Sequence, residues 1–417
     1  TKSRGGSGVT ANRKPLRKSR PTSAAVASMS LISGWKGWRQ FKKLPWDWRN
    51  IVVYSESGQD WHQFSGLIEN LNETLDRKIC YVTSDPQDPG LQRQHENFRS
   101  IFIPEGLFLT IFFQVNQSDL FVLTMMDLQN LQLKRSTYPV HYVYLFHSMG
   151  STHMVDNENS FDHYETLFCA GPHQVAEIRR REEIKGLAAK QLFDYGHPRL
   201  EEVIAHGKSY RAKKNACDTP TVLIAPTWGV DSIFNTCGKE LISVLLDADY
   251  HVVMRPHYQS NRQTPEVIAD VRQAFEGRER FEYIGQMGET DSIMRSDVLV
   301  SDWSAMALEY SMGLEKPVLF IDVPRRIRNP NWQELGIEPV ETTIREQVGE
   351  IVSPGSLQDA PAAIERLISH PERFQEKMKE LRESMVFRLG HSIPDGAEEI
   401  ARLADERLTA RRQRDNA

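Results

Sequence analysis

Short apolar runs rich in β-branched residues alternate with helix-forming stretches along most of this chain. Strands are expected in the first half at residues 51–55, 78–84, 99–103, 119–125 and 140–146. Strands are expected in the second half at residues 221–226, 251–256, 281–285, 297–302 and 317–322. Such alternation of strand and helix favours parallel sheets that are covered by helices. The pattern therefore predicts an α/β protein.

The length of the chain predicts two domains, because 417 residues exceed one ordinary hydrophobic core. Residues 206–220 are polar and basic and lack apolar periodicity, which is typical of a linker. The predicted organisation is a basic arm and Trp-rich segment over residues 1–49, a Rossmann-like domain over 50–205, the linker, a second Rossmann-like domain over 221–385 and a C-terminal helix over 386–417 that packs back on the first domain. Helices of the first domain are expected at residues 161–169 and 174–183, among others.

Several classes of protein are disfavoured by what the sequence lacks. The four cysteines form no CxxC pair and no zinc spacing, which favours free thiols in a reducing compartment. The longest apolar stretch, residues 106–113, is far shorter than the roughly 20 residues of a membrane-spanning helix. A GxxxxGK[ST] loop, a GxSxG elbow, an HExxH motif and a GxGxxG motif after a strand are all missing, so ATP hydrolysis, serine hydrolysis and zinc proteolysis are disfavoured.

The beginning of the chain is a basic arm on an acidic protein. Residues 1–45 contain eleven Lys or Arg and no acidic residue, although the whole chain has a net charge of -5. Residues 1–30 have little to bury and are expected to be disordered. Residues 31–49 interleave four tryptophans with cations, which suits a helix lying on an anionic membrane surface. The alternative is that these tryptophans pack on the protein itself. Nucleic acid is not expected as a partner, because the rest of the chain is acidic.

Two polar clusters directly follow apolar strands of the second half. Arg255 and His257 follow HVVM, and Ser301, Asp302 and Ser304 end or follow DVLV. Open α/β sheets bind ligands at the carboxyl ends of their strands. A guanidinium, an imidazole, hydroxyl groups and a helix start suit a phosphate or pyrophosphate. The alternative is an ordinary set of loop and helix-capping residues.

Histidines at the end of the run at residues 140–146 are candidate general bases. His147 ends this strand, and an imidazole there suits proton transfer near neutral pH. His153 lies a few residues further on and is the alternative base. Either histidine could instead be a structural residue of the turn.

The order of short motifs along the chain resembles one known family. The motifs are FHSMG, FDHYETLFCAGP, DYGHPRLEEV, LIAPTW, RPH, SDVLVSDWSAMALEY and KPVLF, over about residues 140–322. In this order they are similar to the CDP-glycerol glycerophosphotransferase family of teichoic acid and capsule synthesis. The resemblance implies a GT-B fold, in which two Rossmann-like domains face each other across a cleft. It also implies a peripheral protein on the cytoplasmic face of the bacterial plasma membrane, active in cell envelope biosynthesis.

The resemblance also implies a reaction and roles for individual residues. A hydroxyl of a lipid-linked or polysaccharide acceptor would attack the β-phosphate of a CDP-alditol and release CMP. His147 would be the general base, and the donor pyrophosphate would be bound by Arg255, His257, Ser301 and Ser304. The donor nucleotide would be bound by Thr227, Asp302 and Glu309. No cofactor would be required, although a divalent metal could assist, and no protein metal site is expected.

The chain departs from the family pattern at several positions. The family's lysine after the His-Gly pair is missing from His147-Ser148-Met149-Gly150, and Ala305 replaces a serine. Gly229 stands where an arginine is frequent, and His197 where a tyrosine is common. Two alternatives therefore remain open: a GT-B glycosyltransferase that uses a nucleotide sugar for cell-surface polysaccharide synthesis, and a non-catalytic scaffold.

Overall fold

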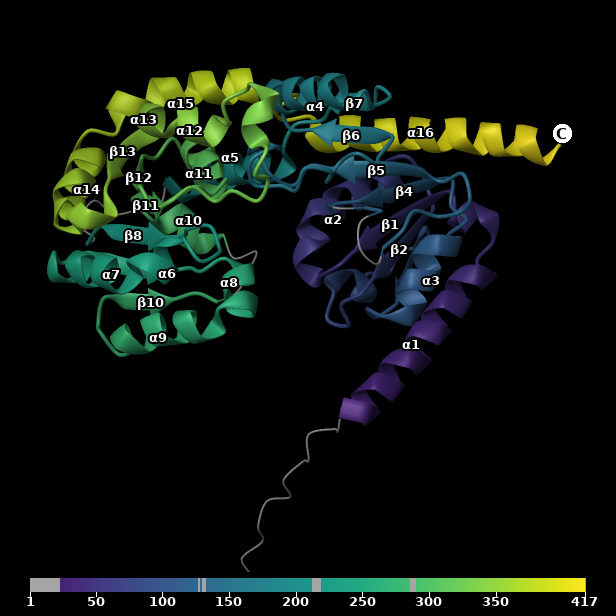
Figure 1. Ribbon diagram of the computed structural model, residues 1–417, viewed down its shortest axis with the longest axis horizontal. Helices are drawn as coiled ribbons and strands as arrows, with labels where there is room; N and C mark the ends of the chain where they lie inside the picture. The colour runs from purple at the N-terminus through teal and green to yellow at the C-terminus, as the bar shows by residue number, and fades with distance from the viewer. Residues whose placement is uncertain (1–22, 127, 130–132, 212–218, 286–289, 417) are drawn as a thin grey trace, which may run out of the picture.

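The chain folds into two α/β domains, each built on one parallel sheet (Figure 1). The computed structural model describes residues 23–126, 128–129, 133–211, 219–285 and 290–416. The first sheet contains, in sheet order, β3 (Phe98–Phe102), β2 (Ile79–Thr83), β1 (Ile51–Ser55), β4 (Leu120–Leu123), β5 (His141–Leu145), β6 (Thr166–Cys169) and β7 (Gln191–Asp194). The second contains β10 (Phe281–Tyr283), β9 (His251–Met254), β8 (Thr221–Ile224), β11 (Val298–Ser301), β12 (Val318–Ile321) and β13 (Gly349–Val352).

Most central strands are buried along their whole length, as expected for a parallel sheet covered on both faces. The predicted two-domain α/β fold is confirmed. The helix expected at residues 161–169 is wrong, because β6 occupies Thr166–Cys169. Strands β7 and β13 were not expected from the sequence at all.

Helices cover both faces of the first sheet and bury two hydrophobic clusters against it. They are α1 (Ser23–Lys43), α2 (Trp61–Glu69), α3 (Leu107–Val115) and α4 (Pro172–Lys185), whereas α5 (Pro198–Arg211) packs on helices of the second domain. Short helical turns are η1 (Trp46–Trp48), η2 (Gly58–Asp60), η3 (Asn70–Thr74) and η4 (Pro89–Gln92). The three described cysteines are free, and Cys217 lies outside the described residues.

Helix α1 begins at Ser23, so the expectation of disorder up to residue 30 is wrong for its last part. Residues 1–22 lie outside the described part of the chain. One face of α1 packs on α3, where Trp38 contacts Phe108 with ring centroids 6.3 Å apart. Phe41 is buried in the same cluster. No helix among the described residues is long and apolar enough to cross a membrane.

Helices and helical turns also surround the second sheet. They are α6 (Ile233–Thr236), α7 (Gly238–Asp247), α8 (Tyr258–Gln263), α9 (Pro265–Phe275), α10 (Asp291–Arg295), α11 (Met306–Leu314), η5 (Trp332–Leu335), α12 (Val340–Thr343), α13 (Arg345–Val348), η6 (Pro354–Asp359), α14 (Ala360–Ser369) and α15 (Glu372–Met385). One continuous hydrophobic cluster fills this domain.

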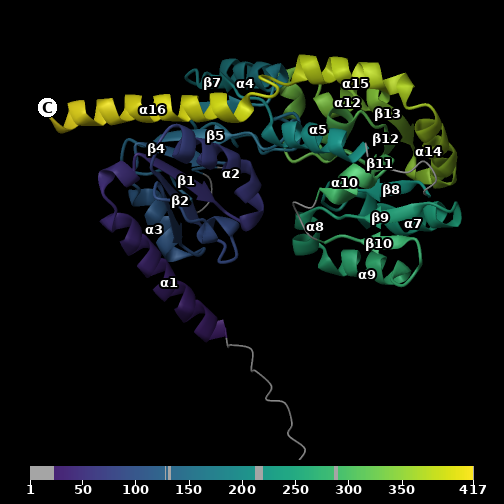
Figure 2. The same ribbon diagram turned by 180° about the vertical axis from the view of Figure 1, so that it is seen from behind.

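Two helices join the domains. Helix α5 packs against α11 and continues to Arg211, so the first part of the predicted linker is helical. Residues 212–218 lie outside the described residues. The C-terminal helix α16 (Ser392–Asp415) returns to the first domain, where it packs against α2 and β4 (Figures 1 and 2). Gly196 has a φ of 91°, which favours glycine, and it lies against Phe387 of the returning segment.

Candidate active site

His147 follows β5 at the carboxyl end of the first sheet. Its ring Nδ1 lies 3.4 Å from the hydroxyl of Tyr144. Burial, followed by the nearby rings of His197 and His62, lowers the pKa of His147 to about 4, although Glu309 acts in the opposite direction. The imidazole is therefore neutral near pH 7 and able to accept a proton.

His257 follows β9 at the carboxyl end of the second sheet. Its Nδ1 accepts a hydrogen bond of 3.2 Å from Gln259 N–H at the start of α8. Burial, then the charges of Arg326 and His147, lower the pKa of His257 to about 3. The ring is therefore neutral, with its proton on Nε2, and it acts as a hydrogen-bond donor without a charge. His147 is thus among the groups that act electrostatically on His257 across the two domains.

Arg255 follows β9 two residues before His257. Its side chain is buried, and Nη1 donates to Ser292 Oγ on α10 over 3.4 Å. The guanidinium is thus turned toward α10. That Arg255 and His257 together bind the donor pyrophosphate stays a prediction.

Three residues predicted to bind the donor have structural roles in the second sheet. Ser301 is fully buried and its hydroxyl donates to Ala225 O over 2.9 Å, which leaves no surface for a phosphate. The buried carboxylate of Asp302 accepts hydrogen bonds from Thr227 N–H at 2.7 Å and Ile233 N–H at 3.4 Å. Burial raises the pKa of Asp302 to about 6, although these hydrogen bonds act to lower it. Asp302 and Thr227 therefore hold the loop after β8, and the contacts of Ser301 and Asp302 with the donor stay predictions.

Ser304 and Glu309 both belong to the beginning of α11, but they differ in their contacts. Ser304 lies one residue before Ala305, which is the N-cap of α11; its hydroxyl accepts a hydrogen bond of 3.3 Å from Met306 N–H, and Ser304 is partly exposed. Glu309 accepts from His197 Nε2 at 3.1 Å, with Arg199 Nε 4.0 Å away. Burial alone would raise the pKa of Glu309, but the His197 bond and the electrostatic effects of His197, Arg199 and His62 lower it. Glu309 therefore joins the domains, and its contact with the nucleotide stays a prediction.

Arg326 is the residue that the sequence interpretation missed. It follows β12, and its guanidinium lies 3.5 Å from the centroid of the Trp228 ring. Trp228 in turn stacks toward His257 at 6.3 Å between centroids. A Cβ atom built on Gly229 would lie 3.9 Å from Arg326 Nε. Gly229 stands where the family frequently has an arginine, so the guanidinium of Arg326 lies beside the position of that arginine. The sequence pattern that could have located it is Pro324-Arg325-Arg326, which follows an apolar strand.

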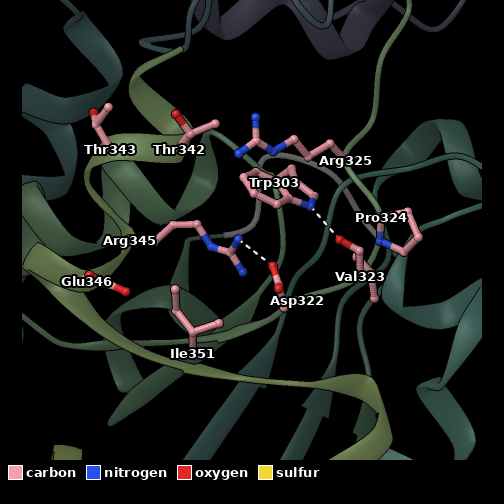
Figure 3. A pocket seen from close by; sticks show the side chains of 10 residues that line it. All are labelled: Trp303, Asp322, Val323, Pro324, Arg325, Thr342, Thr343, Arg345, Glu346 and Ile351. Carbon is pink, nitrogen blue, oxygen red and sulfur yellow. Dashed lines mark hydrogen bonds and ion pairs between the residues drawn. The ribbon is translucent and has the colours of Figure 1, made fainter. Parts of the chain in front are cut away.

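Trp303 supports the loop that carries Arg326. Its Nε1 donates to Val323 O over 2.8 Å, and Arg345 lies 4.1 Å from the ring centroid. Arg345 also binds Asp322 over 2.8 Å (Figure 3). These side chains and Arg325 line an open cavity of about 510 Å³. The contacts hold the segment after β12 on the second sheet.

His153, the alternative base, is buried, and each of its ring nitrogens lies near an oxygen atom of the protein. Its Nε2 lies 2.9 Å from Ile337 O, and Nδ1 lies 3.5 Å from Glu177. It is therefore an interdomain contact, in agreement with the structural alternative. Within the described ranges, no three His, Cys, Asp or Glu side chains come together in a way that could hold a metal ion.

The fold is that of the GT-B class of transferases, with His147 after a strand of one domain and His257 and Arg326 after strands of the other. The solved structure of a variant of the wall teichoic acid polymerase TagF has a TM-score of 0.57 at 15% identity, over 92% of this chain and 97% of that chain. A TagF structure soaked with CDPG gives a TM-score of 0.57 at 15% identity over 92% and 96%. WaaG, a glycosyltransferase involved in lipopolysaccharide biosynthesis, gives 0.50 at 11% identity over 84% and 99%.

Residues 142–323 match the family model described as CDP-glycerol:poly(glycerophosphate) glycerophosphotransferase. This region reaches from β5 through β12 and contains His147 and His257. No curated protein sequence matches the chain. The resemblance seen in the motifs is thus confirmed, and the chain is a CDP-glycerol glycerophosphotransferase-like transferase.

Proposed function

We propose that the protein transfers glycerol phosphate, or another polyol phosphate, from a CDP-activated donor to a hydroxyl of a lipid-linked or polysaccharide acceptor and releases CMP. The observation that carries the proposal is the electrostatic effect of His147, on the first domain, on His257, which lies near Trp228 and Arg326 on the second. His147 and His257 both lie within the region matched to the glycerophosphotransferase family. A base facing a phosphate-binding group is what transfer of a phosphoryl unit to a hydroxyl requires.

The proposed reaction is a displacement at phosphorus. His147 takes the proton of the acceptor hydroxyl, whose oxygen forms a bond to the β-phosphorus of the donor. The bond between that phosphorus and the bridging oxygen breaks, and its electron pair leaves with CMP. Arg326 neutralises charge on the pyrophosphate, while His257 Nε2, Ser304 and the start of α11 donate hydrogen bonds. We propose that these groups suffice without a cofactor, and that a divalent metal is optional.

The proposal is tested by supplying the full chain with CDP-glycerol, CDP-ribitol and common UDP- and CMP-sugars, each with a lipid-linked acceptor. The released nucleotide is identified with and without EDTA. We expect CMP from a CDP-alditol in both conditions. Turnover of a nucleotide sugar alone would instead support the glycosyltransferase alternative. Lack of turnover with every donor would support the scaffold.

We further propose that α1 holds the protein on the anionic cytoplasmic surface of a bacterial plasma membrane. Leu31, Ile32 and Trp35 of α1 are exposed, at 49%, 55% and 42%. Leu107 at the start of α3 is 59% exposed and lines the same shallow pocket as Leu31. The neighbouring cations of α1 are Lys36, Arg39, Lys42 and Lys43. An apolar stripe beside cations suits the headgroup layer of anionic lipid.

Neutralising two of these cations is expected to weaken membrane binding. Each cation near an anionic surface contributes about 1 kcal/mol, so Lys36→Gln with Arg39→Gln is expected to lower vesicle affinity roughly 30-fold. Cosedimentation with phosphatidylglycerol vesicles measures this change. Lys239→Gln, an exposed cation of the second domain, is the matched control and should bind normally. Equal binding of the wild type to neutral phosphatidylcholine vesicles would contradict the proposal.

A further inference from the structure

The segment directly after His147, here called the base loop (residues 148–154), is held tightly by its own domain. Gln174 Nε2 donates to Ser148 O at 2.9 Å and to Gly150 O at 3.0 Å. His173 Nε2 lies 2.8 Å from Met149 O. Glu177 accepts from the N–H and the hydroxyl of Thr152 at 2.6 and 2.8 Å. Helix α4 therefore binds four of the five positions from Ser148 to Thr152, all except Ser151.

The second domain holds the same loop from the other side through residues 328–341, here called the docking segment. Ser151, the position that α4 leaves open, donates its N–H to Glu341 Oε1 over 2.9 Å. The hydroxyl of Ser151 accepts from Val340 N–H over 2.8 Å. Asn329 Nδ2 donates to His153 O at 3.0 Å. Met149 of the base loop is buried in the hydrophobic cluster of the second domain.

Glu341 is the unusual member of this contact. Its carboxyl group is buried close to that of Glu177, and burial raises the pKa of Glu341 to about 7. A buried carboxyl group costs stability unless it is well bonded, and Glu341 Oε2 has no hydrogen-bond partner. A carboxyl group at position 341 therefore costs more stability than an apolar side chain would if its role were only to hold the two domains together. A side chain on Gly150 would collide with Glu341 Oε1, so the loop is also shaped to admit this carboxyl group.

We infer that Glu341 is a positioning residue: by accepting the Ser151 N–H, it fixes the base loop so that His147 is placed opposite His257. His147 directly precedes the base loop in the chain. The interdomain contact therefore acts on the proton acceptor and not on the groups that bind the donor. This inference rests on the proposed function, to which it adds how the second domain controls the base.

The inference is tested with Glu341→Ala and Glu341→Gln in the full-length chain. Glutamine keeps an oxygen that can accept the Ser151 N–H, whereas alanine does not. A displacement of a reacting group by about 1 Å can cost 100-fold in rate, so Glu341→Ala is expected to lower kcat by roughly 10- to 100-fold. The KM for the donor should stay within about twofold, because the donor groups do not depend on the base loop. Glu341→Gln should retain kcat within about threefold.

Nuclear magnetic resonance of the His147 ring gives a readout that is independent of turnover. The ring signal should move in Glu341→Ala and stay in place in Glu341→Gln. If no CDP-alditol reacts with the wild type but the ring signals behave in this way, the proposed function fails and the positioning role stands. Glu334→Ala, an exposed acid of the same segment, should change neither readout. An unchanged kcat and ring signal in Glu341→Ala, or equal loss in both variants, would overturn the inference.

Discussion

Replacing His147 by alanine is expected to lower kcat by about 10²- to 10⁴-fold, the usual contribution of a general base. The acceptor hydroxyl must lose its proton as its oxygen bonds to phosphorus, and His147 is the neutral imidazole at the end of β5. Donor affinity should change little, because His257 and Arg326 lie on the other domain. The measurement is the rate of CMP release with saturating donor and acceptor.

The pH dependence of kcat/KM identifies His147 more specifically. Because burial lowers the pKa of His147 to about 4, its proton-accepting form persists well below neutral pH. The wild-type rate should therefore stay nearly constant from pH 7.5 to 5 and fall only as the pH approaches 4. His206→Ala on the exposed face of α5 is the control and should match the wild type. A tenfold fall per pH unit below 6.5, or full activity of His147→Ala, would contradict the assignment.

The fold could be predicted where strands are apolar along their whole length. Runs such as IVVYS and DVLV lie in the middle of parallel sheets, where both faces are covered, so burial and sequence agree. The missed strands are different: β7 is largely exposed, and β13 begins with Gly349 and Glu350. These two strands belong to the sheets because β7 pairs with β6 and β13 pairs with β12. Pairing with a distant strand cannot be predicted from the local sequence.

The candidate site was predictable in position but not in orientation. The strand ends correctly located His147 and His257, because parallel strands bring their carboxyl ends to one edge. Whether Ser301 faces a ligand or β8 cannot be read from a strand that is apolar on both sides. The pairing of His197 with Glu309 joins residues of different domains and has no local signal. Arg326 could have been found by applying the same strand-end rule once more, after β12.

Replacing Arg326 by alanine is expected to lower kcat/KM for the donor by about 10²- to 10³-fold, as for other groups that stabilise developing charge. His257 is neutral, since burial and Arg326 lower its pKa to about 3, and Arg255 is turned to α10. Arg326 is therefore the cation on which neutralisation of the pyrophosphate depends in the proposed mechanism. Arg326→Lys should recover only part of the rate, because an ammonium group lacks the planar fork that lies over Trp228. Steady-state kinetics and calorimetry with CDP measure both effects.

The ring signal of His257 in Arg326→Ala shows whether Arg326 binds the donor phosphates or only lies near them. Removing the Arg326 charge is expected to raise the pKa of His257, because that charge is one cause of its depression. Arg280→Ala, which removes an exposed arginine paired with Asp249 on the second domain, should change neither kinetics nor the His257 signal. If Arg326→Ala moves the His257 signal but leaves kcat/KM and CDP affinity unchanged, the guanidinium lies beside the donor without binding its phosphates. The frequent family arginine replaced by Gly229 would then have no substitute in this chain.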